Sequence, residues 1–86
     1  FFDTVLIDGS HKKTRVISDT KKALKVLRSG GIILWHDFCP YELVRSKNPH
    51  VDEVCASIEE MLPILNSELT KFAWIDPSWL LVGIKK

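Results

Sequence analysis

Two stretches of the sequence decide the fold: VLIDGSHKK at residues Val5–Lys13 and GGIILWHDF at residues Gly30–Phe38. In each stretch, a run of apolar residues stops at an aspartate that has a histidine close by. Short, β-branched runs without polar alternation are typical of strands that are buried on both faces, as in a parallel sheet. We therefore predict strands at Asp3–Ile7 and Ile32–Trp35, each of which is followed by an aspartate with a histidine nearby.

The segment between these strands has the pattern of an amphipathic helix. From His11 to about Arg28, apolar residues recur at helical spacing, and lysines occupy the other face. Ser10 is predicted as the N-cap, and Gly30-Gly31 as the stop, because glycine adopts the left-handed conformation at little cost. Strand, helix and strand of this length predict a βαβ unit with parallel strands.

The middle of the chain is predicted to hold a loop and one helix. Phe38–Pro49 is rich in turn formers and is predicted as a loop. The helix is predicted from about Val51 to Leu65, and Pro63 should kink it or end it early.

The C-terminal end is predicted as a hairpin. Lys71–Ile75 and Trp79–Ile84 are strand-like, and Asp76-Pro77-Ser78 is a turn candidate between them. The order strand, helix, strand, helix, strand, strand predicts an α/β fold: a doubly wound parallel sheet with a C-terminal antiparallel hairpin. With 86 residues, the chain is one domain at most.

Composition excludes several classes of protein. The formal net charge of +1 gives no argument for binding nucleic acid or an acidic membrane surface. No apolar run approaches the roughly 18 residues that a membrane span requires. Cys39 and Cys55 show no metal-binding spacing, and reduced thiols in a cytoplasmic protein are the expected state.

The polar residues after the two strands form a candidate site. In an open parallel sheet, ligands bind outside the carboxyl ends of the strands. Asp8 and Asp37 leave the sheet at the same edge, so His11 and His36 could share one small volume with them. Carboxylates with an imidazole suit Mg²⁺ or Mn²⁺, and an aspartate could instead orient a histidine as a general base.

Purely structural roles for the same residues stay open. Asp8-Gly9-Ser10 could be only a turn and helix cap, and His36-Asp37 could cap backbone amides where a strand stops. Matching chemistry at two strand ends favours a shared site over either structural role alone.

The stretches FDTVLIDGSH and LRSGGIILWHDF resemble class I S-adenosylmethionine-dependent methyltransferases. More narrowly, they are similar to the small-molecule O-methyltransferase branch, which carries Ile-Asp-Gly-x-His and Gly-Gly-x-x-x-x-His-Asp. The resemblance implies that these strands are the fourth and fifth of a Rossmann-like, seven-stranded sheet. KFAWIDPSWLLVGIKK, residues 71–86, then forms strands six and seven, with the last one antiparallel.

The resemblance also implies what the chain lacks. The family's cofactor site lies mainly in a glycine-rich loop after its first strand, whereas Gly30-Gly31 precedes a strand. We therefore expect residues 1–86 to be the C-terminal part of a methyltransferase domain without its N-terminal cofactor-binding part. The residues that bind S-adenosylmethionine are unknown, and the chain alone should be inactive.

Site roles follow from the resemblance, residue by residue. Asp8, His36 and Asp37 match the positions that bind a divalent cation in metal-dependent relatives, with His36 replacing an acidic ligand. Asp8 and His11 are the expected catalytic residues, and His11 is the general base for methyl transfer to a hydroxyl of a small molecule.

Two features outside this site have alternative roles. Residues 38–50, with Tyr41 and Arg45, either lie over the substrate or form a plain surface connection. Trp74 and Trp79 could seal a homo-oligomer, although packing against the sheet is the expected arrangement.

Two other functions stay open. The chain could be a degenerate, non-catalytic methyltransferase-like module, or a metal-dependent hydrolase that uses the same acids and histidines.

Overall fold

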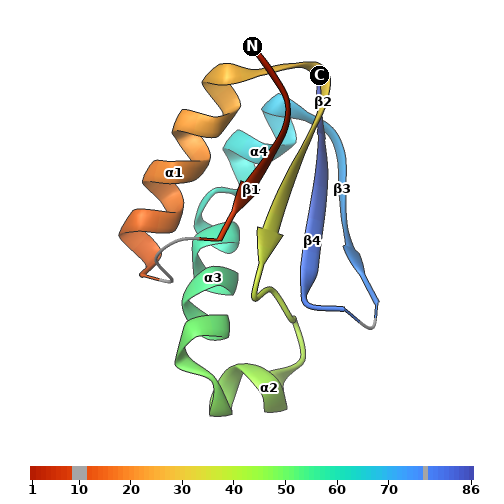
Figure 1. Ribbon diagram of the computed structural model, residues 1–86. Helices are drawn as coiled ribbons and strands as arrows, with labels where there is room; N and C mark the ends of the chain where they lie inside the picture. Colours follow the sequence, from red (N-terminus) through yellow and green to blue (C-terminus); the bar gives the residue numbers. More distant parts are fainter. Residues whose placement is uncertain (9–11, 77) are drawn as a thin grey trace.

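The computed structural model describes residues 1–8, 12–76 and 78–86, and these form an α/β arrangement (Figure 1). The elements along the chain are β1 (Phe2–Ile7), α1 (Lys13–Val26), β2 (Leu27–His36), α2 (Glu42–Lys47), α3 (Pro49–Glu60), α4 (Leu62–Glu68), β3 (Leu69–Ile75) and β4 (Leu80–Lys85). Among the described helices, none has the length and apolar character that crossing a bilayer requires.

The described strands form one mixed sheet in the order β1-β2-β4-β3. β1 is parallel to β2, whereas β4 runs antiparallel to both β2 and β3. The predicted antiparallel hairpin is therefore present, although Pro77 of its turn lies outside the described residues. Since only β4 is reversed, β1, β2 and β3 all end at one edge of the sheet, which we term the strand-end edge.

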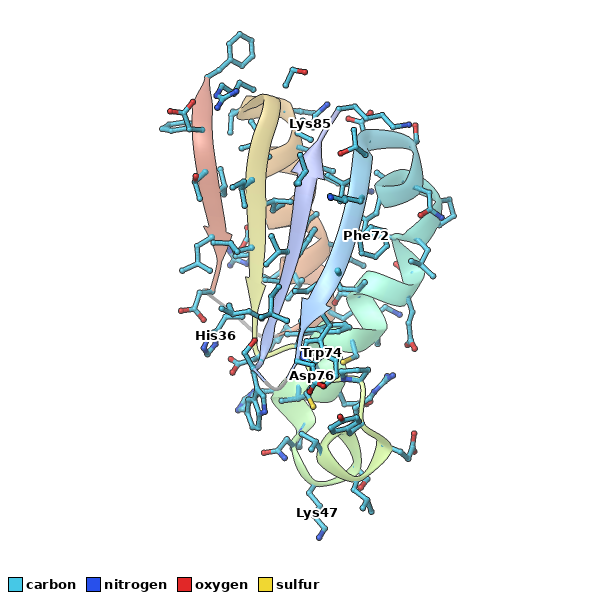
Figure 2. The ribbon with its side chains drawn as sticks, turned by 90° about the vertical axis from the view of Figure 1, so that its right-hand side faces the viewer. His36, Lys47, Phe72, Trp74, Asp76 and Lys85 are labelled. Carbon is cyan, nitrogen blue, oxygen red and sulfur yellow. The ribbon has the colours of Figure 1, made fainter. Side chains whose placement is uncertain are left out.

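The helices cover one face of this sheet. α1, α3 and α4 stand on the same side in Figure 1, and Figure 2 looks onto the opposite, open face. The described residues thus differ from the predicted doubly wound arrangement, in which helices cover both faces. On the open face, Leu6, Leu34 and Val82 lie side by side in the pairing register, and Leu6 is 53% exposed.

The core lies between the sheet and these helices, and Trp35 is its largest fully buried side chain. The indole Nε1 of Trp35 donates a hydrogen bond of 2.9 Å to Oγ1 of buried Thr20 in α1. Beside it in β4, a Cβ at Gly83 would lie 2.7 Å from Cδ1 of Leu69, so a larger residue there would require the Leu69 side chain to shift. Trp35 therefore anchors the end of β2 to α1, one residue before His36.

The join between α1 and β2 differs from its prediction. α1 ends at Val26, and Gly30-Gly31 lie inside β2 instead of stopping the helix. Gly30 has a φ of +80°, at the place where the register between β1 and β2 shifts. The left-handed conformation of Gly30 thus accommodates the irregularity in the pairing of β1 with β2. Ser10, the predicted N-cap, lies outside the described residues.

The segment predicted as the loop Phe38–Pro49 contains the short helix α2. Arg45 of α2 bonds to Asp52 and Glu59 of α3, at 2.9 and 3.0 Å. These ion pairs join α2 to a neighbouring element, and they stabilise a helix whose six residues are too few to be stable alone.

The predicted helix Val51–Leu65 is divided into α3 and α4 at Met61. Pro63 occupies the first turn of α4, where its missing N–H group costs no helical hydrogen bond. The prediction that Pro63 breaks the helix is confirmed.

Candidate functional site

Three predicted site residues meet at the strand-end edge. Nδ1 of His36 lies 3.3 Å from Oδ1 of Asp8 and 3.0 Å from Oδ1 of Asp37. Each residue offers one ligand atom, and these atoms all lie within 4.8 Å of one another. We term Asp8, His36 and Asp37 the acid–histidine cluster. Figure 2 shows His36 at the end of β2, where the strand-end edge lies.

The parallel pairing of β1 and β2 explains why the cluster forms. Ile7 pairs with Trp35, so Asp8 and His36 are the next residues on two adjacent strands. Backbones of paired strands are about 4.8 Å apart, which places the two side chains within reach of each other.

Asp37 joins the cluster through an unusual backbone conformation. Its φ is +62°, in the left-handed region that aspartate tolerates better than most residues. The chain therefore turns sharply after β2, and the Asp37 carboxylate lies beside the imidazole of the preceding residue.

The cluster is open to solvent on one side. The side chains of Asp8 and His36 are each 46% exposed, whereas that of Asp37 is 18% exposed. Nδ1 of His36 can donate a hydrogen bond to either carboxylate or, without its proton, bind a cation together with them. Two carboxylate oxygens and one imidazole nitrogen form a donor set that suits a hard or borderline divalent cation.

Other predicted site residues lie outside this cluster. His11, the expected general base, lies outside the described residues, so its role stays a prediction. Tyr41 precedes α2, and its ring meets that of Trp74 edge-on with the centroids 5.1 Å apart. Arg45 is held by carboxylates of α3, whose hydrogen bonds raise the pKa of its guanidinium above the ordinary value.

The two cysteines lie in a small buried group with Val51. Sγ of Cys55 donates a hydrogen bond of 3.3 Å to the backbone oxygen of Cys39. Burial raises the pKa of the Cys55 thiol above its ordinary value. Both thiols are free, and they pack as apolar side chains.

The backbone of Trp79 meets the chain just after the cluster, at Phe38, and the sequence patterns did not predict this. β2 and β4 pair His36 with Leu80, and the backbone N–H of Phe38 donates to the oxygen of Trp79 at 3.1 Å. Trp79 is 41% exposed, so it is less packed against the sheet than expected. Extending the hairpin register to β2 could have found this neighbour, but no local pattern fixes that register.

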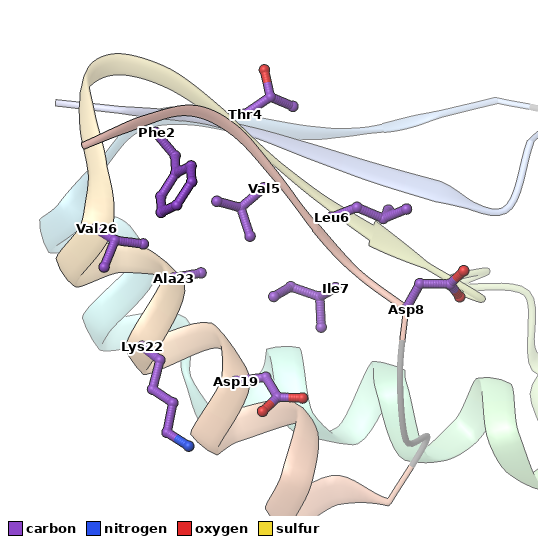
Figure 3. A pocket seen from close by; sticks show the side chains of 10 residues that line it. All are labelled: Phe2, Thr4, Val5, Leu6, Ile7, Asp8, Asp19, Lys22, Ala23 and Val26. Carbon is purple, nitrogen blue, oxygen red and sulfur yellow. The ribbon is translucent and has the colours of Figure 1, made fainter.

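An apolar groove of about 530 Å³ runs along β1 and α1 and reaches Asp8 (Figure 3). Val5 and Ile7 point toward α1, whereas Leu6 points to the other side of the strand. β1 is at the border of the described sheet, so the groove lies beside an unpaired strand edge.

One family model matches part of the chain. Residues 1–38 match the family model described as a methyltransferase domain, which supports a methyltransferase domain over this segment and methyl transfer in general. No curated protein and no solved structure matches the chain significantly. The matched segment contains β1, α1, β2 and the whole acid–histidine cluster.

Proposed function

We propose that the protein containing this chain transfers a methyl group from S-adenosylmethionine to a hydroxyl of a small molecule. The observation that carries the proposal is that the segment matching a methyltransferase domain ends one residue after Asp37 and contains Asp8 and His36. The residues of the acid–histidine cluster therefore all lie within the segment that matches the family model.

In this proposal, the acid–histidine cluster holds a divalent cation such as Mg²⁺ or Mn²⁺. The three donor atoms, which all lie within 4.8 Å of one another, support this role. A bound cation would favour the deprotonated form of an acceptor hydroxyl. Asp8 and Asp37 would also fix the direction from which the acceptor approaches, and such positioning contributes much of the rate of a two-substrate reaction.

The proton of the acceptor requires a base, and His11 is the proposed one. Its place in the sequence, three residues after Asp8, supports this assignment. S-adenosylmethionine supplies an electrophilic methyl group when it is bound. The chain has no glycine-rich loop that follows a strand, so we assign none of its residues to that donor.

The fold supports a larger Rossmann-like domain. An apolar groove and an unpaired strand edge at β1 are the features that further strands and helices would cover. The open face of the sheet, where Leu6 is exposed, supports the same arrangement.

The test uses the full-length protein, labelled S-adenosylmethionine and a panel of hydroxyl acceptors. We expect Asp8→Asn and His11→Gln to lower kcat at least about 100-fold, as for loss of a positioned acid–base group. Asp76→Asn is the matched control, because Asp76 is an exposed carboxylate next to the strand-end edge and outside the cluster (Figure 2).

The outcomes separate the other functions. Wild-type activity in both Asp8→Asn and His11→Gln would contradict the site assignment. Tight Mn²⁺ binding without binding of S-adenosylmethionine would favour a metal-dependent hydrolase. Binding of neither would favour a non-catalytic module.

A further inference from the structure

Asp37 is held in place by a hydrogen bond of the residue that follows it. Its left-handed backbone, with a φ of +62°, is a conformation that persists only where surrounding contacts hold it. The β2–β4 pairing ends at His36 and Leu80, so it does not include Asp37. The next backbone N–H, that of Phe38, donates a hydrogen bond of 3.1 Å to the oxygen of Trp79. The Trp79 oxygen therefore holds the chain where Asp37 turns toward His36.

The position of the Trp79 oxygen depends on the turn between β3 and β4, which Ser78 stabilises. The Ser78 hydroxyl donates a hydrogen bond to the backbone oxygen of Ile75, the last residue of β3. The same hydroxyl accepts a hydrogen bond of 3.2 Å from the backbone N–H of Leu80, the first residue of β4. One side chain thus joins the ends of both strands, directly before Trp79.

Trp74 supports the same turn from the core side. It packs against the main core and against the small buried group of the two cysteines, and its Nε1 donates to the backbone oxygen of Ser78. Figure 2 shows Trp74 and Asp76 at the same end of the sheet as His36. Because Trp74 bonds to the backbone of Ser78, the turn keeps this support when the Ser78 hydroxyl is removed.

We propose that Ser78 is a positioning residue for the acid–histidine cluster. Its hydroxyl fixes the Trp79 oxygen, which in turn fixes the carboxylate of Asp37 as a ligand of the divalent cation. This inference rests on the cation-binding role in the proposed function. Groups that orient the ligands of a metal ion strengthen its binding although they do not touch the ion. Ser78 lies outside residues 1–38, the segment that matches the methyltransferase domain.

Loss of the Ser78 hydroxyl should disturb one of the three cation ligands more than the other two. Ile7 pairs with Trp35, so the β1–β2 pairing places Asp8 and His36 without the hairpin turn. Asp37 alone depends on the bond to the hairpin. Cation binding should therefore weaken without being lost.

The test measures binding of Mn²⁺ to the full-length protein by electron paramagnetic resonance. We expect Ser78→Ala to raise the dissociation constant about tenfold, the lower end of the loss that follows removal of groups that orient metal ligands. Ser78→Thr keeps the hydroxyl and should bind Mn²⁺ within about twofold of wild type. Hydrogen exchange of the Phe38 amide, measured by NMR without metal, should be faster in Ser78→Ala, because its acceptor is held less firmly.

Thr70→Val is the matched control, because Thr70 joins the same two strands at the other end of the hairpin. Its Oγ1 donates a hydrogen bond of 3.3 Å to the backbone oxygen of Ile84. This variant also loses a hydroxyl that bonds across the hairpin, but it should keep the wild-type affinity for Mn²⁺ and the wild-type exchange at Phe38. Equal weakening in Thr70→Val and Ser78→Ala would assign the effect to a general loss of stability and overturn the inference.

Unchanged Mn²⁺ affinity or unchanged Phe38 exchange in Ser78→Ala would also overturn the inference, as would a wild type that binds no Mn²⁺. A methyl-transfer assay on the same samples separates this inference from the proposed function. Mn²⁺ binding that depends on Ser78, without methyl transfer, would contradict the proposed function and leave the role of Ser78 supported. Methyl transfer that depends on Asp8, with Mn²⁺ affinity unaffected by Ser78→Ala, would support the function and overturn the inference.

Discussion

At the scale of single residues, substitutions of Asp37 can distinguish the effect of backbone strain on stability from the effect of the side-chain charge. Its φ of +62° costs a typical side chain about 1–2 kcal/mol, whereas asparagine adopts this region readily. Asp37→Asn and Asp37→Ala both remove the charge next to His36, whereas only asparagine tolerates this conformation well and keeps an oxygen that can accept a hydrogen bond from His36. We expect the alanine variant to be less stable by about 1 kcal/mol, measured by urea denaturation. Equal stabilities would show that the turn does not constrain this position.

The buried thiol of Cys55 should make stability depend on alkaline pH. Burial raises its pKa in the folded protein from the ordinary value of 9.0, so the folded state keeps its proton where the unfolded state loses it. This contribution is complete below pH 9 and is lost as pH rises through the folded pKa. Urea denaturation at pH 7 to 10 should therefore show a steeper loss of stability in wild type than in Cys55→Ala. Parallel curves would contradict the expectation.

At the scale of elements, one buried hydrogen bond connects α1 to β2. Thr20→Val keeps the shape of the side chain but leaves Nε1 of Trp35 without its acceptor. An unsatisfied buried donor costs about 1–3 kcal/mol, which lowers Tm by roughly 4–8 °C per kcal/mol in a domain of this size. Calorimetry measures the shift, and Thr20→Ser, which keeps the hydroxyl, should lose much less. If both variants melt alike, the bond contributes little.

Local patterns predicted the elements that depend on local chemistry. The apolar runs of β1 and β2 and the break near Pro63 follow from side-chain shape and a missing N–H group. α2 was not predicted, because its support comes from the ion pairs of Arg45 with α3. The function of Gly30 was also missed, since the strand irregularity depends on pairing with β1.

The sequence likewise predicted only the part of the candidate site that depends on the order of the strands. Parallel neighbours end at one edge, so the sequence was enough to bring Asp8 and His36 together. The backbone bond between Phe38 and Trp79 follows from the β2–β4 register, which joins residues more than 40 positions apart in the chain. Contacts of that range leave no periodic signal in the sequence.

At the scale of the whole molecule, the helices of residues 12–76 lie on one side of the sheet, and within the described residues an apolar sheet face and the β1 edge are uncovered. Exposed, apolar strand edges promote association between chains, and natural proteins often protect them with lysine. The net charge of +1 provides little repulsion to oppose such contacts.

The 86-residue chain on its own should therefore self-associate, and Leu6→Lys should weaken this association. Leu6 is exposed on the open face beside Leu34, where a lysine adds charge without entering the core. We expect the dissociation constant, measured by sedimentation velocity, to rise at least about tenfold.

Ile64→Lys is the matched control, because Ile64 is partly exposed on α4, away from the sheet's open face. If Ile64→Lys dissociates the chain as strongly as Leu6→Lys, general charge repulsion and not the open sheet face governs association. Circular dichroism of each variant verifies that the secondary structure is retained.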